Sequence, residues 1–183
     1  MRRLPLSRAL VGALLLLAAS FVGGASAQPR GRRAPEWIPI SGTSWSYAVP
    51  ADWQNVQPPP SSQPSTMIVS TVTAPGTARG RFPNVTLVVE PFNQGDARMY
   101  GRAALQMVGQ VATILTSQDT MAGNTPAFDI QARWPNNQPP THALQRIAVS
   151  RGMAHILTCS DTVEAYPQSA ATCQRMMDTF RVR

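Results

Sequence analysis

The chain has 183 residues, which is room for one domain rather than several. Its 16 basic residues are all arginines scattered along the chain, against 9 acids, a balance that suits solubility and gives little support to nucleic-acid binding. With 2 cysteines the fold has no disulfide-rich scaffold and depends on a hydrophobic core.

The first 27 residues have the pattern of a signal peptide. Three arginines lie among the first eight residues, Leu10–Val22 is apolar and uncharged, and Ala25–Ala27 is a small-x-small cleavage site. An uncleaved membrane anchor is the alternative, but the apolar run is short for a span of ~20 residues. We therefore expect a periplasmic or secreted protein that begins at Gln28 and keeps no stable membrane anchor.

A leader is expected between this signal and the folded domain. Residues 28–42 mix proline, glycine and arginine without any hydrophobic period. Such a composition predicts a flexible basic segment. We therefore expect a single domain over residues 43–183.

The first half of the domain is predicted to contain three strands. In Ser44–Val49, large apolar residues alternate with small ones, as in a strand with one buried face. Thr66–Thr73 is rich in β-branched residues. Asn84–Glu90 is apolar at nearly every position, which favours an interior place in the sheet. Loops are expected at Gln54–Pro64 and Ala74–Pro83.

One long helix is predicted next. Asp96 is a suitable N-cap, because its carboxylate accepts hydrogen bonds from the free amides of the first turn. Apolar residues then recur at helical spacing and define one face: Tyr100, Ala104, Met107, Val108, Val111 and Leu115. Gly101 and Gly109 allow close packing on the sheet.

Further strands and a closing helix complete the domain. The strands are expected at Thr116–Asp119, Thr125–Trp134, His142–Ser150 and Met153–Cys159. A helix that starts at Pro167 or Ser169 presents a face of Ala170, Cys173, Met177 and Phe180. The predicted class is α+β, a mainly antiparallel sheet of about six strands with helices packed on it.

The two cysteines carry the strongest chemical signal. In an exported protein they are expected to be oxidised. Cys159 ends a predicted strand and Cys173 lies early in the next helix, so an intramolecular disulfide is favoured over free thiols or an intermolecular link.

No catalytic, metal or cofactor site is predicted. His155 and Cys159 suit zinc only on a helix; on a strand they are about 13 Å apart at ~3.3 Å per residue. Asp161 and Glu164 are better placed to favour the positive end of the closing helix than to form a carboxylate pair. The chain also lacks a G-x-S-x-G elbow and a glycine-rich phosphate loop.

The order of these segments resembles the PsbP-like and DcrB/LpqN-like domains. The resemblance rests on an aromatic first strand ending in Pro-x-x-Trp (Tyr47–Trp53), a Pro-Asn-Val strand (Pro83–Val89), a late Leu-Thr-Cys strand (Ile156–Cys159) and a final Thr-Phe-Arg step (Thr179–Arg181). It implies an α/β/α sandwich around a mainly antiparallel sheet. Relatives include photosystem accessory proteins, bacterial envelope proteins, secretion-effector chaperones and a Ran-binding import factor, which share no active site.

We therefore expect a non-catalytic binding or assembly-accessory protein of the bacterial envelope, with another envelope protein as its partner. Trp53, Arg79, Arg81 and Phe82 lie in predicted loops and are the expected contacts, because tryptophan and arginine dominate interface energetics. Trp134 is expected to pack in the core.

Two alternatives remain open. A small-ligand or lipid carrier needs a cavity between sheet and long helix, lined by Met107, Val111 and Phe128. A hydrolase needs His142 or His155 within hydrogen-bond reach of a carboxylate.

Overall fold

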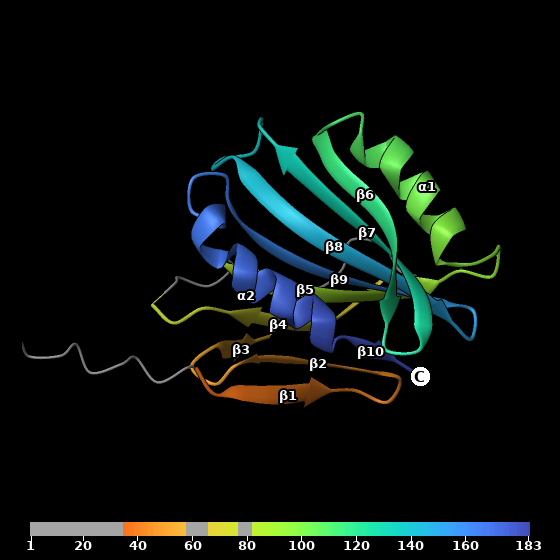
Figure 1. The fold of residues 1–183 in the computed structure, drawn as a ribbon, viewed down its shortest axis with the longest axis horizontal. Coiled ribbons are helices and arrows are strands. Elements are labelled where there is room, and N and C mark those ends of the chain that lie inside the picture. The colour runs from red at the N-terminus through yellow and green to blue at the C-terminus, as the bar shows by residue number, and fades with distance from the viewer. Residues whose placement is uncertain (1–34, 58–65, 77–81) are drawn as a thin grey trace, which may run out of the picture. The chain divides into compact units, whose positions relative to one another are not determined.

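The computed structural model describes residues 35–57, 66–76 and 82–183 (Figure 1). Within these residues the larger sheet has seven strands, in the order β3 (Gln54–Val56), β4 (Met67–Thr73), β5 (Asn84–Pro91), β9 (Met153–Thr162), β8 (Thr141–Ser150), β7 (Thr125–Trp134) and β6 (Thr113–Ala122). The smaller sheet has three strands, in the order β1 (Trp37–Ser41), β2 (Trp45–Pro50) and β10 (Arg181–Val182). The α+β class is confirmed, whereas the expected number of about six strands is too low.

Every strand pairing in the two sheets is antiparallel. Hairpins join β6 to β7, β7 to β8 and β8 to β9, and β9 then pairs with β5 from Asn84↔Ser160 to Pro91↔Met153. Because β9 is the middle strand of the larger sheet, both of its faces are covered. Its run from Ala154 to Leu157 is accordingly buried at each position.

The flexible leader expected over residues 28–42 is wrong at residues 37–41, which form β1. This strand pairs with β2 from Trp37↔Pro50 to Ser41↔Ser46, and Trp37 packs against the core. The guanidinium carbon of Arg175 lies 4.3 Å from the centroid of the Trp37 ring. The sequence of β1 lacks the alternation of apolar and polar residues that is typical of a strand, which is why a flexible leader was predicted there. The compact unit accordingly begins at Pro35 rather than at residue 43; residues 1–34, including the expected signal peptide, lie outside the described residues.

The expected extension of the first helix is also wrong. Helix α1 spans Ala97–Val108, and the Asp96 carboxylate caps it by accepting from the Met99 amide at 2.9 Å. Leu115 belongs to β6, which is ten residues long rather than the short strand expected at Thr116–Asp119. The apolar residues beyond Val108 match helical spacing only by coincidence.

The buried face of α1 is made of small residues, Ala97, Gly101 and Ala104. A Cβ atom at Gly101 would lie 2.2 Å from Cδ1 of Phe128 on β7, so only glycine fits this crossing. The close packing expected at Gly101 is therefore confirmed. Met107, by contrast, points to solvent.

Helix α2 spans Tyr166–Thr179 and starts one residue before the earlier of its two expected starts. Cys173, Met176 and Met177 form its buried face, and Phe180, directly after the helix, is fully buried. The helix thus presents the expected apolar stripe to the sheet.

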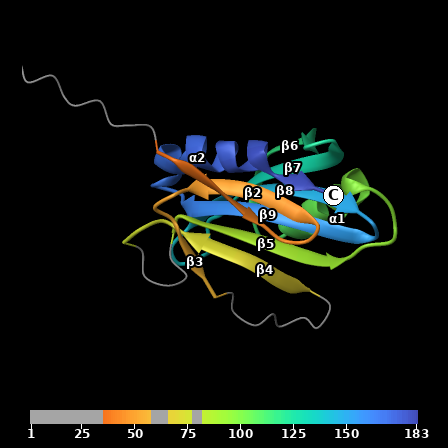
Figure 2. The ribbon, with the colours of Figure 1, turned by 90° about the horizontal axis from the view of Figure 1, so that it is seen from below.

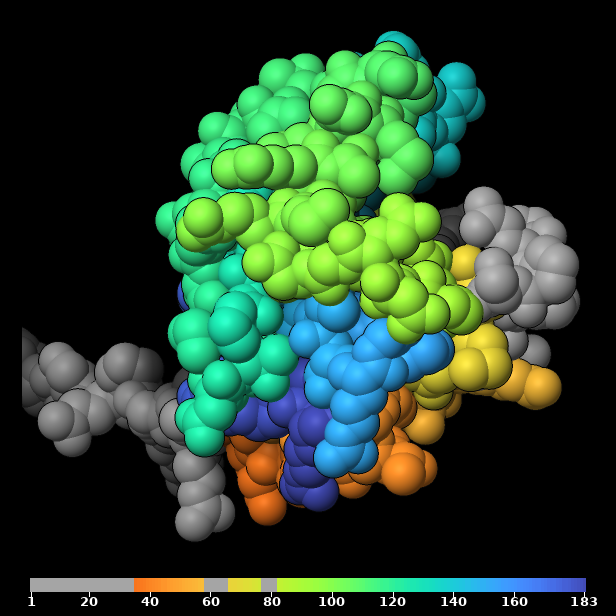
Figure 3. Space-filling model, turned by 90° about the vertical axis from the view of Figure 1, so that its right-hand side faces the viewer, coloured from red at the N-terminus to blue at the C-terminus, as the bar shows by residue number. Residues whose placement is uncertain are grey.

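The two helices cover opposite faces of the larger sheet (Figures 1 and 2). One core lies between this sheet, α2 and the smaller sheet; the other lies under α1. Figure 3 shows α1 and the segment before it resting on the β8–β9 turn, where the Phe92 amide donates to the Gly152 carbonyl at 2.7 Å. Neither helix described here is long and apolar enough to cross a membrane.

Candidate functional site

One end of the larger sheet brings together Trp53 and Phe82, two of the residues expected to contact a partner. The pairings Gln54↔Thr73, Thr73↔Asn84, Asn84↔Ser160 and Thr141↔Thr162 bring the starts of β3, β5 and β8 level with the ends of β4 and β9. We call this region the proline end. It comprises Trp53, Phe82, Pro83, Pro139, Pro140 and the β9–α2 connection Val163–Ala165.

A first groove of about 310 Å³ lies beside Trp53 at this end. Its lining comes from four parts of the chain: Trp53, Ala74, Pro83, Asp161, Ala165, Gln168, Ser169 and Thr172. Trp53 is half-buried and packs against the core, and its backbone amide donates to the Pro50 carbonyl at 3.0 Å. The indole is therefore both held in place and accessible from the groove.

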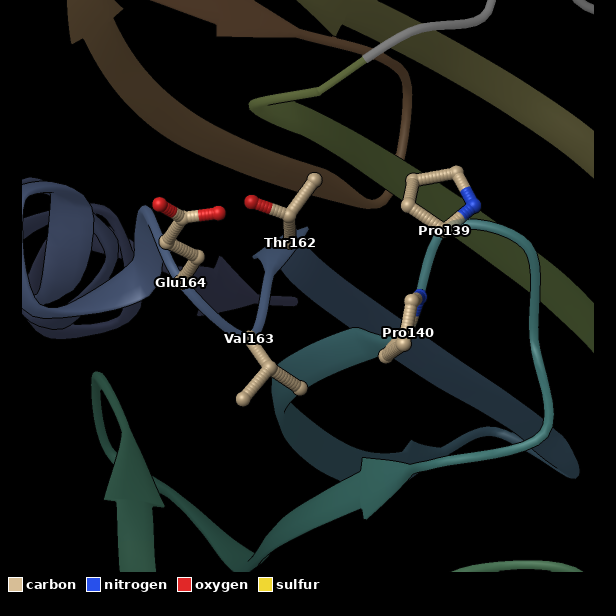
Figure 4. Close-up of a pocket in the computed structure, with 5 residues that line it drawn as sticks. All are labelled: Pro139, Pro140, Thr162, Val163 and Glu164. Atoms are coloured by element: carbon tan, nitrogen blue, oxygen red, sulfur yellow. The ribbon is translucent and has the colours of Figure 1, made fainter.

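A second groove of about 370 Å³ lies on the other side of the β9–α2 connection (Figure 4). It is lined by Pro139, Pro140, Thr162, Val163 and Glu164. Thr162, Glu164 and Pro139 point to one side in Figure 4, whereas Val163 and Pro140 point to the other. The connection between the two grooves thus presents polar and apolar side chains in alternation.

The β9–α2 connection is held by hydrogen bonds at both ends. The Val163 amide donates to the Pro140 carbonyl at 2.9 Å, and the Ala165 amide donates to Oγ1 of Thr162 at 3.2 Å. The buried Asp161 carboxylate accepts from the Thr162 amide at 2.7 Å. These bonds hold the β9–α2 connection in one conformation.

The predicted disulfide between Cys159 and Cys173 is confirmed, and it links β9 to α2 beside the first groove. Both cysteines are fully buried, with Cα atoms 5.5 Å apart, and Cys173 directly follows the groove residue Thr172. One detail differs: β9 does not end at Cys159 but continues to Thr162. Because its sulfur is in the bridge, Cys159 is not a thiolate ligand of the kind considered above with His155.

His142 packs beneath the start of α2. Its ring stacks on Tyr166 with centroids 3.6 Å apart, and its Nε2 lies 2.8 Å from Nε2 of Gln131. Burial lowers the pKa of His142, with a smaller contribution from the charge of Arg133, and burial also raises the pKa of the Tyr166 hydroxyl. The neutral imidazole therefore serves to hold α2 on β8.

His155 lies elsewhere, on the middle strand, 1% exposed and with Nε2 3.1 Å from Oγ of Ser44. Burial lowers its pKa. Within the part of the chain described, no carboxylate is hydrogen-bonded to His142 or to His155. The arrangement that a hydrolase needs is thus not formed by these residues.

The three residues expected to line a carrier's cavity, Met107, Val111 and Phe128, do not enclose one together. Met107 and Val111 are 62% and 61% exposed, so they point away from the sheet. Phe128 is buried in direct contact with Gly101, which fills the space between helix and sheet. The expectation fails because it placed Val111 on the helix.

The structure places two of the four expected contact residues, Trp53 and Phe82, at the proline end, each half-buried. Arg79 and Arg81 lie outside the described residues. Trp134 is half-buried and packs against the α1 core, as expected. The remaining groove residues were missed because their proximity depends on strand register.

A buried ion pair was also missed. Arg146 makes two bonds of 2.8 Å to the Asp129 carboxylate and donates to the carbonyls of Met177 at 2.8 Å and Met121 at 3.2 Å. The alternation in β7 predicts an exposed Asp129, yet this residue is 4% exposed. A cation at the carbonyl end of α2 is favourable, and it ties that end to β7 and β8.

The fold and site together define an α+β protein of the α/β/α sandwich type, with a structured groove surface at one end of its sheet. Solved structures share this fold, which is the PsbP-like and LpqN-like fold that the motifs predict. The solution structure of cyanobacterial PsbP (CyanoP) from Synechocystis sp. PCC 6803 matches with a TM-score of 0.60 and 13% identity, over 87% of this chain and 100% of that chain.

Two further structures have the same arrangement. LpqN, involved in cell envelope biogenesis of Mycobacterium tuberculosis, has a TM-score of 0.56 and 12% identity over 82% of this chain and 92% of that chain. A protein of unknown function, PA94, from Pseudomonas aeruginosa has a TM-score of 0.51 and 16% identity over 80% and 97%. No family model and no curated protein matches the chain. At these identities the likeness concerns the fold.

Proposed function

We propose that this chain is an exported, non-catalytic accessory protein of the bacterial envelope that binds another protein through its proline end. The observation that carries the proposal is the pair of grooves on either side of the β9–α2 connection, with Trp53 accessible in one of them. Export is supported by the signal-peptide pattern and by a buried disulfide, since disulfides persist in oxidising compartments.

The shape of this surface suits a protein partner. Trp53 offers a large aromatic face, the type of residue that most often anchors an interface. The disulfide and the hydrogen bonds of the connection hold the grooves in one conformation, which lowers the entropy lost on binding. Val163 and Pro140 add apolar contact area, and Glu164 adds an exposed charge at the rim.

Site-specific photo-crosslinking tests this proposal. A photoreactive residue at Gln168, which lines the groove on the exposed side of α2, is expected to capture a protein in intact envelopes. The matched control is the same residue at Gln106, exposed on α1 and outside both grooves. Equal capture at the two positions, or capture at neither, would contradict a partner at the proline end.

A blocking variant tests the same surface without touching the core. Gln168→Trp fills the groove from its rim and is expected to remove the crosslink formed from a second probe at Ser169, whereas Gln106→Trp leaves it intact. Melting temperatures of both variants close to that of the wild type are the control for folding. A crosslink that survives Gln168→Trp would show that the groove is not the contact.

A further inference from the structure

Within the residues that the structure describes, no strand pairs with the outer edge of β6. β6 is the last strand of the larger sheet and has ten residues, whereas β3 at the opposite edge has three. Side chains from Leu115 to Asp119 are exposed on both faces of the sheet, and α1 reaches this stretch through the exposed ion pair of Arg98 with Asp119. Its outer backbone groups are therefore available for pairing with another strand.

Few of the usual protective features occur on this edge. Natural proteins block edge strands with proline, with charged side chains or with a bulge. β6 has no proline and no arginine, and its one acid, Asp119, is paired with Arg98 of α1. A bulge between Ile114 and Thr116 leaves the stretch from Thr116 onward regular.

The sequence of this stretch is complementary to itself. We propose that β6 pairs antiparallel with β6 of a second copy of this chain, about a two-fold axis at Gln118. This register places Ser117 opposite Asp119, Thr116 opposite Thr120, and Leu115 opposite Met121. Hydroxyl faces carboxylate, threonine faces threonine and apolar faces apolar, which are favourable cross-strand pairs.

Charge and exposed apolar area agree with this register. Asp119 of each copy faces a serine rather than the other Asp119, and each carboxylate already has its own arginine at 2.9 Å. Leu115 and Met121 are 38% and 48% exposed in the single chain and would cover each other in the pair. A two-fold pairing also occupies the β6 edge of each copy, so the assembly closes as a dimer instead of growing into a fibre.

The proposal is independent of the proposed function, because the β6 edge shares no residue with the proline end. Sedimentation equilibrium of the purified, exported protein over rising concentration is expected to show a monomer–dimer equilibrium. Gln118→Lys and Gln118→Glu place like charges opposite each other, and each alone is expected to weaken dimerisation roughly fivefold. A mixture of the two variants is expected to recover it. Gln110→Lys, exposed before β6, is the matched control.

A cysteine at the axis tests the register itself. Gln118→Cys introduces the only free thiol, because both native cysteines are in the buried disulfide. Under mild oxidation it is expected to form a covalent dimer much faster than Gln110→Cys. A protein that stays monomeric at all concentrations, a mixture that does no better than its components, or equal crosslinking at 118 and 110 would overturn the proposal. Pairing of β6 only with a different protein would overturn it too.

Discussion

Replacing Arg146 with methionine is expected to be among the most destabilising single substitutions in this protein. The change keeps much of the side chain's length but removes four hydrogen bonds, two to Asp129 and two to backbone carbonyls. It leaves the Asp129 carboxylate, whose side chain is 6% exposed, without a counter-charge. Loss of one member of a buried ion pair costs about 3–5 kcal/mol, a large part of the ~5–15 kcal/mol that holds a domain folded.

Urea unfolding followed by tryptophan fluorescence measures this cost. The double variant Arg146→Met/Asp129→Val removes both charges and is expected to recover at least ~2 kcal/mol, because the unpaired carboxylate is the main penalty. Arg98→Met, at an exposed pair with Asp119, is the control and is expected to leave the midpoint unchanged. The reasoning is refuted if Arg146→Met behaves like Arg98→Met, or if the double variant is no more stable than the single one.

Three further changes test the core. Replacing both Cys159 and Cys173 with serine opens the disulfide, whose cysteines are 14 residues apart in the sequence. The free energy of unfolding measured with urea is expected to fall by about 3 kcal/mol, to the value of the wild type under reductant. Gly101→Ala, despite better helix propensity, forces a methyl group against Phe128 and is expected to cost about 1–3 kcal/mol, with an unchanged Tm as the contrary outcome. The pKa of His155 in the folded protein lies below its ordinary value of 6.5, so the unfolded chain binds more protons at this residue. Stability therefore falls as the pH drops from 6.5 toward the folded-state pKa. His155→Gln is expected to flatten that part of the curve of Tm against pH, and an equal slope in the variant and the wild type would contradict this reasoning.

Sequence periodicity predicted the elements in which apolar residues recur at regular spacing along the whole segment. β7 and β8 were recognised because apolar residues recur along both segments as they do in strands. Asp96 marked the start of α1 because a cap acts locally through its own carboxylate. The PsbP-like and LpqN-like fold followed from short motifs at the ends of such segments.

Failures occurred where distant contacts override local pattern. β1 exists because β2 is available to pair with it, and nothing in residues 37–41 alone indicates that partner. The end of α1 was missed because Val111 and Leu115 continue its spacing by coincidence. At the site, Trp53 was found by residue type, whereas Pro139 and Glu164 meet only through the register of β8 with β9.

The smaller sheet joins distant parts of the domain, and this has a consequence for the order in which the domain folds. β2 pairs with β10 at Trp45↔Val182, and the amide of Arg183 donates to the Ser44 carbonyl at 2.9 Å. Contacts of such long sequence separation form slowly. The pairing of β2 with β10 is therefore expected to form late in folding, after the hairpins of the larger sheet.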